Sequence, residues 1–378
     1  MNTKVWIVVV VVVAIIAGSI GYFAKTPQVV TSTTTYTTTS AAVYTTTTTV
    51  TYTTTSASTT TYTTTVTTTR QYYPITVKDA LNRTVEIASE PATVVSLAPS
   101  ITQILVALGL CNRIVGLDQF SYQLLEELNS TRCLPANVEV IKINAMSPTG
   151  FNGDAIVLLH PDIVLADAGF EALWANYLPR LGVTVYFLNG TRAASYRNIE
   201  NDVYALGAIF NREQAAASVV RWMESQLEKY RGATNVTVAQ IAWINPDGSF
   251  YAAGNNTFIS AEITAGGGIN AIGKGGWGPF EPSLLIAANP EVIVLGSMGY
   301  NCTYALKALS QIPGISNVAA YRNGRVYVLT GLAEDAVDQP SLLSVYGAAI
   351  FHYIIAGKAP QCVDTKWFLS QFSPRLGG

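Results

Sequence analysis

The sequence predicts an α/β protein with two lobes, and three observations lead to that prediction. Short β-branched apolar runs alternate with amphipathic stretches from residue 71 onward, as they do in parallel sheets covered by helices. Residues 154–167 (DAIVLLHPDIVLAD) and 282–297 (PSLLIAANPEVIVLGS) repeat one pattern of helix, His/Asn-Pro and strand. A long helical stretch over 195–231 lies between the repeats. We therefore expect two Rossmann-like lobes with parallel sheets, separated by a single long helix.

A membrane anchor and a stalk are expected before the lobes. Trp6 to Ala24 is uncharged over about 19 residues, enough to span a bilayer core of about 30 Å as a helix. A cleaved signal peptide is the alternative. The Thr-rich tract 26–70 has no large apolar core residues, so we expect a disordered, O-glycosylated stalk. Its alternative is strand pairing, because Thr and Tyr favour strands. The expected organisation is 1–25 cytoplasmic tip and anchor, 26–70 stalk, 71–194 first lobe, 195–232 connecting helix and 233–378 second lobe.

The stretch Thr93 to Asp118 contains the first βαβ unit. An apolar strand, Val94–Leu97, meets a turn at Ala98-Pro99-Ser100, and a helix with Gly109 at its end follows. That turn lies at the carboxyl end of a strand, where open α/β sheets bind ligands. A short N-terminal hairpin is expected at 75–77 and 84–87. Further strands are expected at 114–117, 163–166, 183–188, 236–244, 250–253, 292–296 and 326–329, and helices near 101–109, 121–128, 152–159, 170–181, 258–265, 281–288, 303–310 and 341–357.

Composition argues against several functions. Only 12% of the residues are charged and the net charge is −2, with no basic patch, so we expect no nucleic-acid partner. His160 and His352 are the two histidines, so a His-built metal site is not expected. No G-x-S-x-G, H-E-x-x-H or phosphate-binding loop motif is present, so we do not expect an enzyme.

Four cysteines and six glycosylation sequons indicate an exported domain. Three disulfide pairings are possible; the assignment of two cysteines to each lobe favours Cys111–Cys133 and Cys302–Cys362, and four buried free thiols are the alternative. The N-x-S/T sequons fall mostly in expected loops, which is consistent with a glycoprotein. They lie at Asn82, Asn129, Asn189, Asn235, Asn255 and Asn301.

The sequence resembles the cobalamin- and iron-siderophore-type (class III) solute-binding proteins of ABC importers. The resemblance rests on VVSLAPSITQILVALGLCNRIVGLD, the two repeats, and the segments beginning at Gly254 and Gly266. It implies lobes joined by one rigid helix, with a metal chelate (ferric siderophore, haem or corrinoid) carried between them and no covalently bound cofactor. It also implies delivery to an ABC permease. Together with the expected N-terminal anchor, this predicts a monomeric, extracellular domain held by a single pass in the same membrane as the permease.

Candidate ligand-binding residues follow from the rule that ligands touch the carboxyl ends of strands. Their aromatic members suit a large planar ligand. In vitamin B12-binding members of the family, cleft aromatics match Trp277 and Phe120; filling of the core is the alternative role for both. The candidates are Ser100, Phe120, Tyr122, Met146, Asp167, Asn245, Tyr251, Trp277, Met298 and Tyr300, and a wider set adds Pro99, Ser147, Phe170, Ser297, Glu334 and Asp335.

Permease docking has two candidates by the same resemblance. The family carries one exposed acidic residue on each lobe; Asp154 matches the first position, and Glu281 lies two residues before the second. A carboxylate that only stabilises its helix dipole is the alternative for Asp154. For the whole chain, two other classes stay open: a cell-surface structural or adhesion protein that keeps the fold without transport, and a surface enzyme using the cleft.

Overall fold

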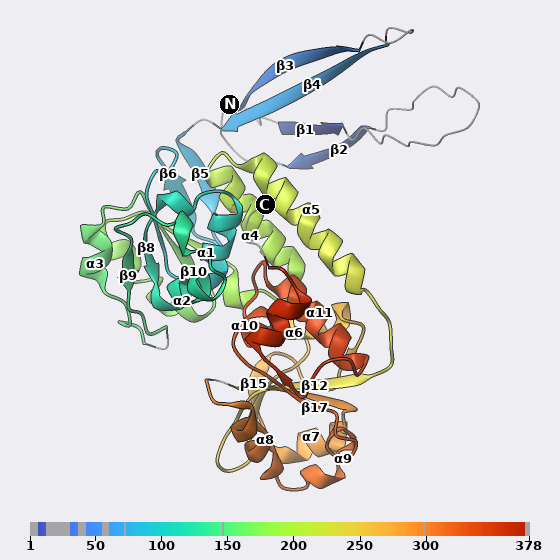
Figure 1. The fold of residues 1–378 in the computed structure, drawn as a ribbon. Coiled ribbons are helices and arrows are strands. Elements are labelled where there is room, and N and C mark those ends of the chain that lie inside the picture. The colour runs from blue at the N-terminus through green and yellow to red at the C-terminus, as the bar shows by residue number, and fades with distance from the viewer. Residues whose placement is uncertain are drawn as a thin grey trace, which may run out of the picture. The chain divides into compact units, whose positions relative to one another are not determined.

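The computed structural model describes residues 7–12, 31–36, 43–54, 60–71, 73–145, 147–297 and 299–374 (Figure 1). One compact unit comprises Lys78–Arg83 and Pro91–Gly378. From Pro91 onward, both lobes and the connector between them therefore belong to the same unit.

The first lobe is built on a fully parallel sheet of five strands in the order β11-β10-β7-β8-β9. The order reverses between β7 and its neighbour β10, and such a switch point leaves a crevice at the carboxyl ends of the strands. β9 was not expected because it is three residues long and two of them are exposed. The strands are β7 Val94–Ser96, β8 Ile114–Asp118, β9 Glu139–Ile141, β10 Ile163–Asp167 and β11 Val185–Leu188.

Helices cover both faces of this sheet. On one face Ile156, Trp174 and Phe187 belong to one buried cluster. The helix expected at 170–181 is wrong: two 3₁₀ turns occupy the segment, because Pro179 cannot donate a helical hydrogen bond and Gly182 adopts a left-handed conformation. The helical elements are α1 Pro99–Ala107, η1 Cys111–Arg113, α2 Gln119–Glu127, η2 Thr131–Cys133, α3 Gly153–Leu158, η3 Phe170–Trp174, η4 Leu178–Leu181 and η5 Gly190–Arg192.

The second lobe has a mixed sheet, which corrects the expectation of a parallel one. Its order is β15-β13-β12-β16-β17-β18, with β14 also paired to β12. β13 and β15 run antiparallel to their neighbours, because residues 245–249 are too few for the crossover that a parallel pair needs. The strands are β12 Thr237–Ile244, β13 Phe250–Ala253, β14 Ile269–Asn270, β15 Trp277–Phe280, β16 Val292–Gly296, β17 Val326–Leu329 and β18 Cys362–Val363.

Two helical layers enclose the second sheet. Figure 1 shows α7, α8 and α9 on one face and α6, α10 and α11 on the other, and Leu285, Leu309 and Ala320 of the first layer share a buried cluster with the strands. The helix expected at 341–357 begins at Ser344, after Pro340, and α10 and α12 were not expected. The elements are α6 Phe258–Ala265, α7 Pro282–Ala288, α8 Cys302–Ser310, η6 Ile315–Asn317, α9 Ala319–Arg322, α10 Leu332–Asp338, α11 Ser344–Ile355 and α12 Thr365–Gln371.

The connector consists of two helices, α4 Tyr196–Ile209 and α5 Glu213–Tyr230, so the expected single helix is wrong. Asn211 breaks it with a φ of 51°, a left-handed conformation that Asn tolerates at helix ends. α4 packs against α1 of the first lobe, and α5 packs against α11 of the second. The two helices approach closely at Gly207, where an added Cβ would lie 2.6 Å from the Cβ of Ala216. Each half of the connector therefore belongs to one lobe.

The N-terminal segments form strands where the structure describes them. β1 Ile7–Val12 pairs with β2 Thr31–Tyr36, and β3 Val43–Thr54 pairs with β4 Thr60–Gln71. The disordered stalk is thus corrected over these ranges, since Thr, Val and Tyr favour extended backbone; the rest of the expected anchor lies outside the described residues. Among the described residues, no helix has the length and apolarity to cross a membrane. The expected hairpin is present as β5 Ile75–Lys78 and β6 Thr84–Ile87.

The cysteines form two disulfides, Cys111–Cys133 and Cys302–Cys362, the pairing that the sequence favoured. The first closes a loop with a sequence separation of 22 inside the first lobe. The second has a separation of 60 and joins the start of α8 to β18. The two links therefore constrain chain segments of different length.

Removing the two disulfides should cost different amounts of stability. A longer closed loop removes more entropy from the unfolded chain, so Cys302→Ser/Cys362→Ser should lose about 4 kcal/mol and Cys111→Ser/Cys133→Ser about 3 kcal/mol. Urea unfolding of both double variants and of the parent protein, without reductant, measures the difference. A larger loss for the first-lobe pair would contradict the loop-length argument.

Candidate functional site

A cavity of about 1060 Å³ opens between the two lobes. This volume is at the upper end of the range for small-molecule sites. Both walls come from the carboxyl ends of strands and the segments that follow them. The first lobe contributes Leu97, Ala98, Pro99, Ser100, Asp118, Phe120, Gln123, Leu124, Ile143, Ala145, Asp167, Gly169, Phe170, Glu171 and Thr191, and the second Ala242, Trp243, Asn245, Tyr251, Phe258, Ile259, Trp277, Asp335, Asp338, Gln339 and Pro340.

The first wall is positioned by helix starts and turns. Asp118 ends β8 and caps α2, its Oδ1 accepting hydrogen bonds from the backbone N–H of Phe120 at 2.9 Å and of Ser121 at 3.0 Å. The cap fixes the first turn of α2, which presents Phe120, 52% exposed, to the cavity. Asp167 ends β10 and accepts hydrogen bonds from the N–H of Thr191 at 2.7 Å and its hydroxyl at 2.8 Å.

Aromatic side chains dominate the second wall. Trp243 on β12 is the cross-strand partner of Tyr251 on β13, and Ala253 of β13 is the partner of Trp277 on β15. The antiparallel edge of the sheet thus brings three aromatic residues to the cavity. Tyr251 is 44% and Trp277 48% exposed, so their rings are available to a ligand instead of filling the core.

Carboxyl groups from both lobes face the cavity without cationic partners. Its lining includes Asp118, Asp167, Glu171, Asp335 and Asp338, and none of the described lining residues is Lys, Arg or His. Burial raises the pKa of Asp118 to about 6. Burial, followed by repulsion from Glu127 and Glu334, raises the pKa of Asp335 to about 7. Burial raises the pKa values of Glu171 and Asp338 well above their usual range. The cavity therefore carries partial negative charge at neutral pH.

Two hydrogen bonds to adjacent backbone groups connect the lobes; we call them the interlobe brace. The side-chain oxygen of Gln103 on α1 accepts a bond from the Leu343 N–H at 3.1 Å. The hydroxyl of Tyr196, at the start of α4, donates to the Ser344 carbonyl at 2.9 Å. Tyr196 also makes an edge contact with Phe258 of α6, with ring centroids 5.1 Å apart. The brace lies in buried surroundings, since Gln103 and Leu343 are each 1% exposed.

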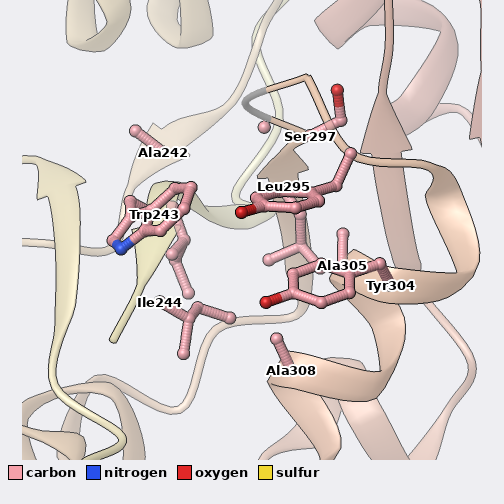
Figure 2. A pocket seen from close by; sticks show the side chains of 11 residues that line it. Ala242, Trp243, Ile244, Leu295, Ser297, Tyr304, Ala305 and Ala308 are labelled. Carbon is pink, nitrogen blue, oxygen red and sulfur yellow. The ribbon is translucent and has the colours of Figure 1, made fainter. Parts of the chain in front are cut away.

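A second, much smaller cavity of about 20 Å³ adjoins the large one, and Ala242 and Trp243 line both. Figure 2 shows Trp243 and Tyr304 on opposite sides of it. Tyr300 stacks on Tyr304 with ring centroids 4.2 Å apart and lies 5.8 Å from Trp243.

Six of the ten cleft residues predicted from the sequence line the large cavity. Tyr300 lines the small cavity instead. Tyr122 lines neither, because it lies two positions after Phe120 on α2, about 200° around the helix. Met146 and Met298 lie outside the described residues. The six are Ser100, Phe120, Asp167, Asn245, Tyr251 and Trp277.

Sequence reasoning missed several lining residues. Asp118 could have been predicted from the rule that ligands touch the carboxyl ends of strands, because it is the last residue of β8. Asp338 lies on α10, which the buried positions Leu332, Ala333, Ala336 and Val337 mark at helical spacing. No sequence pattern marked Trp243 as a cavity residue, because its position depends on the pairing of β12 with β13. The docking candidates are both exposed: Asp154 in the first turn of α3 and Glu281 as N-cap of α7.

Two α/β lobes with a large cavity at the carboxyl ends of their strands define a two-lobed solute-binding protein. Residues 94–332 match the model of the periplasmic binding protein family, and the chain belongs to that family. This confirms the resemblance to substrate-binding proteins of ABC importers. Among the described residues, no group of three or more His, Cys, Asp or Glu side chains is arranged to hold a metal ion.

Two relatives place the chain more closely. It is 27% identical over 267 residues to YvrC of Bacillus subtilis, an uncharacterised ABC transporter substrate-binding lipoprotein, covering 68% of this chain and 78% of the relative. It is 27% identical over 277 residues to a cobalamin-binding protein of Halobacterium salinarum, covering 71% and 70%. The crystal structure of an Fe³⁺-hydroxamate transport protein from Saccharomonospora viridis has the same fold, with a TM-score of 0.60 at 19% identity, covering 75% of this chain and 99% of that one.

The raised pKa of Asp335 predicts a pH-dependent stability. The folded protein holds this proton up to about pH 7, whereas the unfolded chain releases it near 3.8. The stability contributed by this group is therefore present below pH 3.8 and is lost as the pH rises to about 7. Asp335→Asn should raise the free energy of unfolding at pH 8 by up to about 4 kcal/mol, with little effect at pH 3.5. Denaturant titrations at both pH values measure it; equal effects would contradict the assignment.

Proposed function

We propose that this protein captures a corrinoid in the cavity between its lobes and delivers it to an ABC permease. The observation that carries the proposal is the cavity itself: about 1060 Å³, with aromatic side chains on both walls. Flat faces and a large volume suit a macrocyclic ligand, because each aromatic contact gains about 0.5–1.5 kcal/mol beyond burial. A relative named as cobalamin-binding supports the same ligand class.

The charge of the lining favours a corrinoid over strongly anionic chelates. Haem propionates or a catecholate siderophore would bring carboxylate or phenolate charge next to Asp118, Asp167 and Asp335, with no Lys, Arg or His among the described lining residues to neutralise it. Burying an unpaired charge is costly. A corrin ring, whose periphery carries neutral amides, avoids that cost and offers donors and acceptors to the carboxyl groups and to Asn245 and Gln339.

Binding of candidate ligands tests the proposal. Cyanocobalamin at 100 times its dissociation constant should stabilise the protein by about 2.7 kcal/mol in thermal unfolding, and haem and ferric enterobactin should give no comparable shift. Trp277→Ala and Phe120→Ala should each weaken cobalamin binding about 10-fold.

Tyr321→Ala is the matched control for these variants. Tyr321 is an exposed aromatic residue of α9 and does not line the cavity, so its loss should leave affinity unchanged. Stabilisation by haem but not by cobalamin would overturn the ligand assignment. No shift with any of the three would favour a surface protein that keeps the fold without transport, and turnover of a bound ligand would favour an enzyme.

We further propose that Asp154 and Glu281 are the docking residues for the permease, and that residues 1–25 and 26–70 tether the domain to the same membrane. Both carboxylates are exposed at the start of a helix, one in each lobe. Exposed charges in this position are available to arginines of a partner. The lipoprotein relative is itself a membrane-attached substrate-binding protein by name.

Reversal of one docking charge should separate transport from binding. Asp154→Arg should lower ligand uptake by cells or proteoliposomes on the order of 10-fold, because a like charge then faces the permease arginines, while the dissociation constant of the ligand stays the same. Glu224→Arg, on the exposed face of α5, is the control and should transport normally. Unchanged uptake by Asp154→Arg would remove this residue from the interface.

A further inference from the structure

Three aromatic rings extend from the large cavity along the second lobe; we call them the aromatic ladder. Trp243 belongs to the wall of the large cavity and to that of the small one. Tyr300 follows at 5.8 Å between ring centroids, and Tyr304 stacks on it at 4.2 Å with the ring planes 21° apart. The ladder is thus continuous with the proposed ligand site but leads away from it.

The outer two rings are exposed, and the backbone that carries them is hydrogen-bonded. Tyr300 is 46% and Tyr304 50% exposed. Tyr304 lies in the first turn of α8, where its backbone N–H is held by the Asn301 cap at 2.9 Å, and the backbone N–H of Tyr300 is held by the Ser297 carbonyl at 2.8 Å. Within the described part of the chain, neither phenol hydroxyl has a hydrogen-bond partner. The rings therefore offer flat, neutral surfaces on a backbone that hydrogen bonds hold in place.

The small cavity beneath the ladder cannot contain a ligand group. Its volume of about 20 Å³ is suited to a single water molecule, and apolar side chains such as Ile244, Leu295 and Ala308 line it (Figure 2). A group that uses the ladder must therefore lie against the faces of the tyrosines. Flat heteroaromatic groups bind in this way, because base–aromatic stacking is strong and requires no hydrogen-bond pattern.

We propose that the aromatic ladder is a subsite for the heteroaromatic base of a corrinoid's nucleotide tail. The corrin ring would occupy the large cavity, and the base would stack on the outer face of the Tyr300–Tyr304 pair beyond its mouth, where each ring supports the other. This inference rests on the proposed function. It adds that the protein discriminates complete corrinoids, which carry the base, from incomplete ones, which do not.

Two ligands that differ in the tail test the ladder directly. Cyanocobalamin carries the nucleotide and dicyanocobinamide lacks it, so calorimetric titration of both against one protein measures the contribution of the whole nucleotide, and the tyrosine variants then test the part that comes from the base. The parent protein should bind cyanocobalamin about 10-fold more tightly than cobinamide. Tyr300→Ala and Tyr304→Ala should each reduce that preference several-fold while the affinity for cobinamide stays the same.

Two further variants show whether the ring itself is responsible. Tyr300→Phe keeps the aromatic face without the hydroxyl and should retain the preference for cyanocobalamin. Tyr321→Ala removes an exposed tyrosine from α9, which precedes β17 and so lies at the opposite end of the strands; it should behave as the parent protein. Thermal unfolding of every variant verifies that the fold is intact.

The outcomes distinguish this subsite from the proposed function. If Tyr300→Ala weakens both ligands equally, or neither, the ladder does not contact the base and the inference is wrong, while corrinoid binding stands. If the parent protein binds the two ligands with equal affinity, the inference is equally wrong. If the parent protein binds neither ligand, the proposed function fails and the subsite fails with it.

Discussion

The shape of the cavity depends on the interlobe brace. Gln103 and Tyr196 come from different parts of the chain, yet they hold neighbouring backbone groups of residues 343 and 344. Because the atoms concerned are buried, loss of either partner would leave an unpaired polar group away from water, at a cost of about 1–3 kcal/mol. The brace thus links the two walls directly, beside the cavity that their aromatic and carboxyl groups line.

The two-helix connector complements this brace. α4 belongs to the first lobe: Asp202 on it accepts hydrogen bonds from the backbone and side-chain nitrogens of Asn189, at 3.0 and 2.8 Å. α5 belongs to the second lobe, where Trp222 makes an edge contact with Tyr346 at 6.2 Å. Since the helices meet closely at Gly207, movement of one lobe against the other requires repacking of this contact. Dense helix packing resists such movement, so we expect small closures of the cavity rather than wide opening.

Much of the fold was predictable because its signals are local. β-branched runs such as Val292–Gly296, followed or preceded by amphipathic helices, gave strand positions to within a residue or two. The failures were elements whose identity depends on tertiary contacts. The connector divides at Asn211 because this residue adopts a left-handed backbone conformation, which the apolar pattern does not show. The antiparallel edge formed by β13 and β15 depends on strand pairing, which the apolar pattern does not show either. The prediction for the Thr-rich tract was wrong for another reason: its composition is compatible with both a disordered coil and a strand.

Most of the predicted residues that line the cavity follow the strand-end rule, whereas Trp277, the first residue of β15, was supported by the family resemblance. Ser100, Asp167 and Asn245 each follow or end a strand, and all three line the cavity. Trp243 escaped because it lies inside β12. Tyr122 does not line the cavity, because sequence proximity to Phe120 does not mean the same helix face. Asp338 escaped because helix α10 was not recognised, although Asp335 on the same helix was in the wider set of candidates.

The Cys302–Cys362 disulfide has a consequence for recognition. It anchors the first residue of α8, directly beside the segment that carries Tyr300 and Tyr304, to the edge strand β18. Reduction of this link would remove the covalent tie between the start of that helix and β18. Cystine bonds persist in oxidising surroundings, so the support that this tie gives to the proposed subsite depends on the redox conditions around the protein.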